Sequence, residues 1–96
     1  MNIIRKAQAG SFESSDILIL AAPVEEGEGR DIQIESGVYM QYGEAIEKLI
    51  HQVLDQFDVN DVQLQIHDKG AIEPVILARM ETVMQRALNQ QKGTMY

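Results

Sequence analysis

The sequence predicts an α+β fold in which two helices cover one face of a mainly antiparallel sheet of about four strands. Three observations lead to this prediction. Short segments with strand-like patterns come first, two long segments with helical periodicity follow, and one further strand-like segment separates the two helices. The expected order is therefore strand, strand, strand, helix, strand, helix.

The first two strands are expected to form a hairpin. In residues 7–12, Ala7, Ala9 and Ser11 alternate with Gln8, Gly10 and Phe12. Residues 17–22 are continuously apolar. Between them lie four acidic or small residues, Glu13-Ser14-Ser15-Asp16, which is typical of a turn. The sequence therefore places two serine hydroxyls at an exposed hairpin tip.

The third strand is expected over residues 31–35, where apolar and polar side chains alternate strictly. A half-buried strand of this kind has one face toward the core. We expect Leu18 and Leu20 of the second strand to share that buried face with Ile32 and Ile34.

The helices are expected over residues 38–57 and 72–88, on either side of a fourth strand that begins at Val62. Ser36 is the expected N-cap of the first helix, and Pro74 fits the first turn of the second. The predicted core consists of one stripe from each helix together with strand residues: Ile46, Leu49, Val53, Val75, Met80, Val83, Leu64 and Ile32.

Length and composition fit one domain over residues 1–96, with residues 90–96 expected to be a frayed tail. No apolar run approaches the roughly 20 residues that span a bilayer. No export signal is evident, so we expect a cytoplasmic protein. The formal charge of −7 repels phosphate backbones and anionic lipids. Neither nucleic acid nor a membrane is therefore an expected partner, whereas a protein with a basic docking surface is.

The sequence offers few groups for catalysis. There is no cysteine, and the two imidazoles, His51 and His67, are expected to face solvent. Asp68 beside His67 provides too few ligands for a metal site. Ser14 and Ser15 have no evident base to activate them. From the residues alone, these serines are either turn formers or hydroxyls to which another enzyme attaches a group.

Several ordered fragments together are similar to one protein family. The chain resembles the acyl carrier protein (gamma subunit) of citrate lyase from its N-terminus to about Leu88. The fragments that carry the resemblance are Ala9-Gly10-Ser11-Phe12-Glu13-Ser14-Ser15-Asp16, Asp31-Ile32-Gln33-Ile34, Gln41-Tyr42-Gly43-Glu44-Ala45-Ile46, Val62-Gln63-Leu64, Asp68-Lys69-Gly70-Ala71 and Ala78-Arg79-Met80-Glu81.

The resemblance implies that Ser14 carries 2′-(5″-phosphoribosyl)-3′-dephospho-CoA through a phosphodiester, with Ser15 at a small-residue position. The chain would then be a phosphoprotein without catalytic residues. Its covalent prosthetic group would carry acetyl and citryl thioesters while citrate is cleaved to acetate and oxaloacetate in citrate fermentation. The implied partners are the alpha (acyl transferase) and beta (citryl lyase) subunits, a prosthetic-group transferase and an acetylating ligase.

Two alternatives without catalysis, and a third that is an enzyme, remain at this point. One is a non-catalytic acidic protein-interaction module, in which Ser14 is only a turn residue. The other is the carrier subunit of a malonate decarboxylase-type complex, which uses the same kind of prosthetic group. An enzyme is the third hypothesis, and the lack of an activated nucleophile opposes it.

Overall fold

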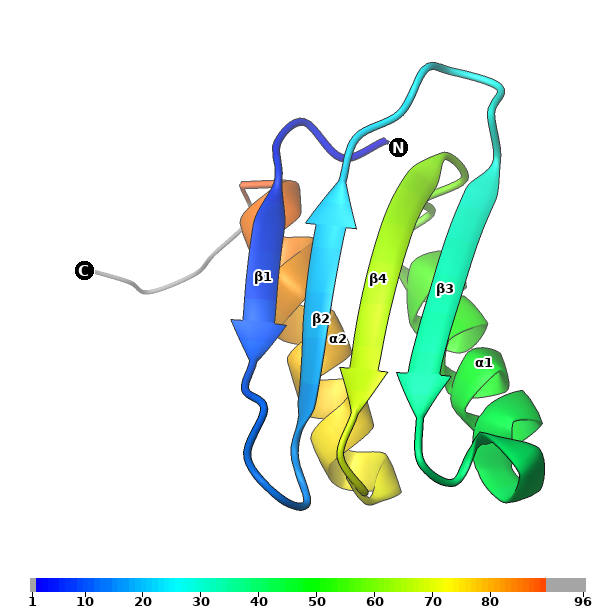
Figure 1. Cartoon of the computed structure of the whole chain (residues 1–96). Coiled ribbons are helices and arrows are strands. Elements are labelled where there is room, and N and C mark those ends of the chain that lie inside the picture. Colours follow the sequence, from blue (N-terminus) through cyan, green and yellow to red (C-terminus); the bar gives the residue numbers. More distant parts are fainter. Residues whose placement is uncertain (1, 90–96) are drawn as a thin grey trace.

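The structure is a computed structural model that describes residues 2–89, except for the side chains of Tyr39 and Met40. The predicted class and element order are confirmed (Figure 1). The elements are β1 (Ala7–Gly10), β2 (Ile17–Ala22), β3 (Arg30–Ser36), α1 (Tyr39–Gln56), β4 (Val62–Asp68) and α2 (Glu73–Ala87). The expected tail at residues 90–96 lies outside the described residues. No helix within the described range is long and apolar enough to cross a membrane.

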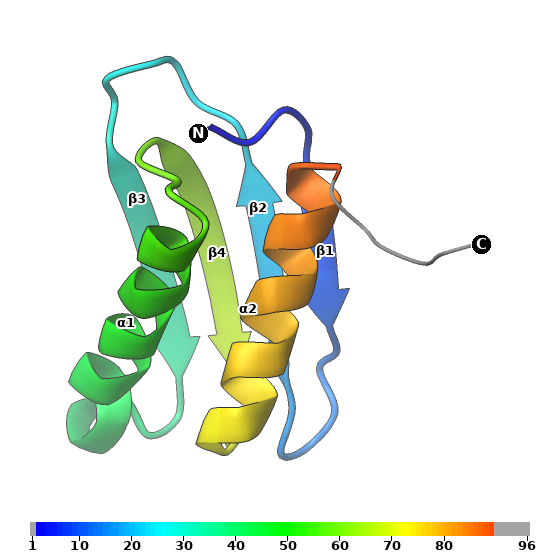
Figure 2. The ribbon, with the colours of Figure 1, turned by 180° about the vertical axis from the view of Figure 1, so that it is seen from behind.

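The four strands form one sheet in the order β1-β2-β4-β3. Strand β2 pairs antiparallel with both β1 and β4, whereas β3 and β4 are parallel. Parallel pairing requires a crossover connection, which α1 supplies. Figures 1 and 2 show both helices on the same side of the sheet, so the opposite side is left open.

The face assignment of β2 differs from the expectation. Ile17 and Ile19 point toward the helices and are fully buried, whereas Leu18 and Leu20 lie on the open face. The register explains this, because Leu18 pairs with the open-face residue His67. The prediction that Leu18 and Leu20 share a face with Ile32 and Ile34 is therefore wrong. A continuously apolar strand carries no alternation that would distinguish its two faces.

Most of the predicted core is buried. Ile46, Val53, Met80, Val83 and Leu64 are at most 4% exposed, as expected. The remaining three predicted core residues are only partly buried and pack against the core from its margin, which corrects the expectation for Leu49, Val75 and Ile32.

Ser36 is the last residue of β3 and not the N-cap of α1. The N-cap is Val38, which makes no side-chain capping bond. The Ser36 hydroxyl donates to the Asp68 carboxylate at 2.9 Å because β3 and β4 end side by side. The predicted placement of Pro74 in the first turn of α2 is confirmed.

Gly10 at the end of β1 is expected to tolerate no side chain. Its φ is +94°, and an added Cβ would lie only 1.7 Å from the Ile17 carbonyl oxygen. Gly27 has a similar φ of +91° but nothing within 4 Å. Gly27→Ala should therefore cost about 1–2 kcal/mol for the left-handed backbone alone. Gly10→Ala should cost about 1–3 kcal/mol more because of the steric clash. Urea denaturation of both variants checks this, and equal losses would contradict it.

Candidate functional site

Ser14 and Ser15 lie at the centre of a β-turn that joins β1 to β2. The turn is closed by the Asp16 N–H, which donates to the Glu13 carbonyl at 3.1 Å. Ser15 has a φ of +68°, the left-handed conformation that a type II turn requires at its third residue. Both serines are exposed, so the predicted hairpin tip is confirmed. Among the described residues, no group is hydrogen-bonded to the Ser14 hydroxyl.

The turn is fixed to the segment that follows β4. The Ser15 N–H donates to the Lys69 carbonyl at 2.8 Å, and the Lys69 N–H donates to the Asp16 carbonyl at 2.9 Å. The register of β2 and β4 continues into this pair, because Ile17 is opposite Asp68. The backbone that follows Ser14 is therefore held by the segment after β4, while the Ser14 hydroxyl has no hydrogen-bond partner within residues 2–89.

Asp16 anchors the turn to α2. Its carboxylate accepts hydrogen bonds from the Arg79 guanidinium (3.0 and 2.9 Å), the Ser11 hydroxyl (2.6 Å) and the Ile17 N–H (2.7 Å). These contacts, Arg79 first, hold the pKa of Asp16 well below its ordinary value. The hydrogen bonds between Asp16 and Arg79 also raise the pKa of Arg79. Asp16 is thus an ionised structural anchor with its oxygens occupied, and not a free base for Ser14.

Asp16 should make stability depend on pH in the acidic range. Because its pKa is lower in the folded than in the unfolded chain, its stabilising contribution is complete above about pH 4 and decreases as the pH falls below that value. The difference in unfolding free energy between the wild type and Asp16→Asn should therefore shrink on acidification. Urea denaturation at several pH values measures this difference. Asp31→Asn, at an exposed position, is the charge-matched control. A difference that does not change below pH 4 would refute this assignment.

The two histidines do not assemble a catalytic pair. His67 lies on the open face, and its Nδ1 is 3.0 Å from the Glu35 carboxylate. Asp68 is buried on the opposite face, so the His67–Asp68 pair weighed from the sequence is not formed. His51 and His67 are both partly buried, not fully solvent-facing as expected, and His51 is hydrogen-bonded to Arg30 at 2.9 Å. Within residues 2–89, no three acidic or histidine side chains form a candidate metal site.

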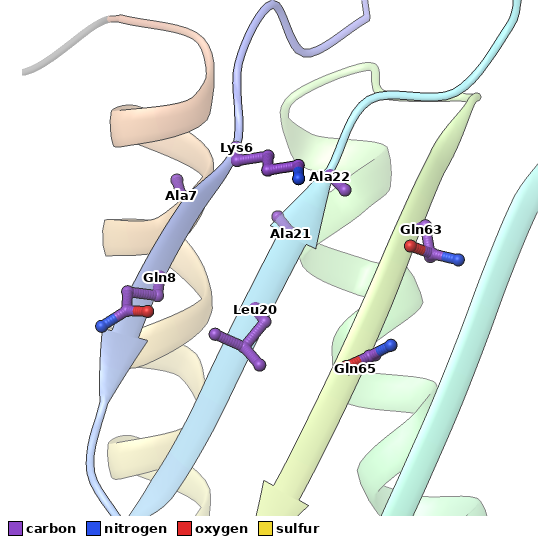
Figure 3. A pocket seen from close by; sticks show the side chains of 8 residues that line it. All are labelled: Lys6, Ala7, Gln8, Leu20, Ala21, Ala22, Gln63 and Gln65. Atoms are coloured by element: carbon purple, nitrogen blue, oxygen red, sulfur yellow. The ribbon is translucent and has the colours of Figure 1, made fainter.

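Two of the hollows in the described part of the chain lie on different sides of the molecule. One, of about 400 Å³, lies on the open sheet face toward the end of β2 that is remote from Ser14, and Leu20, Gln63 and Gln65 line part of it (Figure 3). The other, of about 440 Å³, is more apolar and lies between α1 and α2, where Tyr42 and Ile72 are exposed. Neither hollow contains the Ser14 turn.

Sequence reasoning missed the side chains that surround the turn. Arg79 is 63 residues from Asp16, and Lys69 comes next to the turn only through strand pairing. The only available signal was that Arg79 and Lys69 belong to fragments that carry the family resemblance.

Comparisons with known proteins show which family the chain is similar to. The family described as malonate decarboxylase delta subunit (MdcD) matches residues 4–87. The citrate lyase acyl carrier protein of Serratia proteamaculans (strain 568) is 47% identical over 87 residues, which cover 91% of this chain and 84% of that protein. The citrate lyase acyl carrier protein of Yersinia enterocolitica (serotype O:8 / biotype 1B) is 46% identical over 90 residues, which cover 94% of this chain and 92% of that protein.

A solved structure has the same fold. It is a chain in the crystal structure of a Pseudomonas malonate decarboxylase hetero-tetramer in complex with malonate. The TM-score is 0.72 at 23% identity, and the match covers 86% of this chain and 84% of that one. The chain therefore belongs to a family of acyl carrier subunits, that of the malonate decarboxylase delta subunit and the citrate lyase acyl carrier protein. The resemblance to the citrate lyase carrier stated from the sequence is thereby confirmed.

Proposed function

We propose that this chain is the acyl carrier subunit of a citrate lyase complex and that its prosthetic group is attached to Ser14. The observation that carries the proposal is the exposed Ser14 hydroxyl, which has no hydrogen-bond partner among the described residues and lies on a turn fixed by its neighbours. The chain is also closely related to citrate lyase acyl carrier proteins. The proposed group is 2′-(5″-phosphoribosyl)-3′-dephospho-CoA, joined through a phosphodiester.

The residues at the turn fit such a group. The Ser14 hydroxyl faces solvent, so a bulky substituent displaces no packed side chain. No base lies in hydrogen-bond contact with this hydroxyl among the described residues, so a separate transferase would have to activate it. When bound, the group would supply a thiol that carries acetyl and citryl groups as thioesters.

The chain itself would contribute position and delivery. Arg79 holds the Asp16 carboxylate, and the Lys69 backbone holds the backbone of Ser15 and Asp16. A fixed attachment point gives the arm a defined origin from which to reach two partner sites. Tethering would replace diffusion by a high effective concentration at each of them. The proposed partners are the alpha and beta subunits of the complex, the prosthetic-group transferase and the acetylating ligase, all in the cytoplasm.

A second candidate is the carrier subunit of a malonate decarboxylase. The family match over residues 4–87 supports it, since that family is described by the malonate decarboxylase delta subunit. The relatives that are 46–47% identical are named for citrate lyase, so we favour citrate lyase.

Reconstitution separates these candidates. The chain, loaded by the transferase and acetylated by the ligase, is mixed with citrate lyase alpha and beta subunits or with the other subunits of a malonate decarboxylase. Citrate cleavage that depends on loaded chain is expected in the first mixture. Malonate decarboxylation in the second alone would favour the other carrier. Activity in either mixture with unloaded chain would refute a carrier role through a covalent arm.

A further inference from the structure

An aromatic and cationic cluster of side chains lies beside the Ser14 turn. Phe12, two residues before Ser14, is 61% exposed although it is large and apolar. Its ring centroid is 5.4 Å from that of His67, and the two planes are inclined by 59°. The Lys69 ammonium lies 5.8 Å from the centroid of the same ring. We call Phe12, His67 and Lys69 the platform.

The position of the platform relative to Ser14 is fixed by backbone contacts. Lys69 exchanges backbone hydrogen bonds with Ser15 and Asp16 at 2.8 and 2.9 Å. His67 is held at the other side by the Glu35 carboxylate, 3.0 Å from its Nδ1. The Lys69 backbone and the His67 ring are therefore held in place beside the turn that carries Ser14.

The charge of the platform contrasts with that of the molecule. The whole chain carries a formal charge of −7, and Glu13 is adjacent to Ser14 in the turn. A phosphate placed on Ser14 would be repelled by the Glu13 carboxylate. Lys69 supplies the opposite charge there, because the Asp16 carboxylate already occupies Arg79.

We propose that the platform binds the nucleotide part of the group carried by Ser14, with the Phe12 ring stacked on the purine base and the Lys69 ammonium paired with a phosphate. This deepens the proposed attachment at Ser14 and rests on it. Aromatic side chains stack on nucleobases of any kind, and lysine binds phosphate as a point charge. An exposed ring with a cation over one of its faces offers both contacts at once.

Binding of a free nucleotide tests the platform without the lyase. Unloaded protein labelled with ¹⁵N is titrated with 3′-dephospho-CoA and followed by NMR. Saturable shifts are expected at Phe12, His67 and Lys69. Phe12→Leu should weaken binding about five- to tenfold, because stacking on an aromatic ring contributes on the order of 1 kcal/mol or more per base. Lys69→Gln should weaken it about two- to fivefold, as for an exposed ion pair, and Lys69→Arg should restore it.

The matched control is Lys48→Gln, which removes the same charge from an exposed position on α1. It should leave nucleotide binding unchanged. If Lys48→Gln and Lys69→Gln weakened nucleotide binding equally, the loss would be due to net charge alone, and the proposal would be overturned. The absence of saturable shifts at the platform would also overturn it. Because 3′-dephospho-CoA is not attached to the protein, this experiment tests the platform even if Ser14 is never loaded. A chain that is not loaded at Ser14 but binds the probe would contradict the proposed attachment, not the platform.

Discussion

Ser14→Ala is expected to yield a folded protein that cannot be loaded and a complex that does not cleave citrate. The Ser14 hydroxyl is exposed and lacks a hydrogen-bond partner among the described residues, so its loss should change the unfolding free energy by no more than about 0.5 kcal/mol. Without the hydroxyl, no phosphodiester can form at this position. Denaturant titration, intact mass after incubation with the transferase, and citrate cleavage in the reconstituted complex measure the three consequences.

Ser15→Ala is the control for this variant. Ser15 lies in the same turn and is also exposed, and alanine keeps the side chain small at a φ of +68°. This variant should still be loaded and should support citrate cleavage. Binding to the alpha and beta subunits should be unchanged in both variants. If Ser14→Ala bound these subunits poorly, loss of activity would reflect assembly, and the proposed role of the hydroxyl would fail.

Leu54→Ala is expected to destabilise the fold by about 2–5 kcal/mol. Leu54 is fully buried on α1 within the core, so its truncation leaves a cavity that the packed surroundings fill only in part. Leu49, on the same helix, is only partly buried and borders the hollow between the helices. Leu49→Ala should therefore cost less, under about 2 kcal/mol. Urea denaturation of both variants measures this, and equal costs would show that the core is wrongly placed.

The sequence predicts the elements well because their signals are local. Strict alternation marked β3, and helical spacing of apolar residues marked α1 and α2. The strand order was not predictable from local patterns. The position of β4 between β2 and β3 depends on where the chain re-enters the sheet after α1. The face of β2 was wrongly predicted, since Ile17 to Leu20 are apolar on both sides.

The candidate site was predicted only in part. Local turn chemistry placed Ser14 at an exposed tip, and that much is confirmed. The contact between Asp16 and Arg79 joins residues 63 positions apart, and that between Phe12 and Lys69 depends on strand pairing. Neither contact has a local pattern. Physical reasoning alone also left Ser14 and Ser15 equivalent, although the structure now separates them: Ser15 has the left-handed backbone and donates its N–H to Lys69.

The most direct test of the account is to locate the attached group. The wild-type chain is incubated with the prosthetic-group transferase and the triphosphate precursor of the group, digested, and analysed by tandem mass spectrometry. We expect a single modified peptide that contains residues 13–16, with the added mass on Ser14 and none on Ser15. A modification located on Ser15, or outside this turn, or full loading of the Ser14→Ala variant, would contradict the proposed attachment.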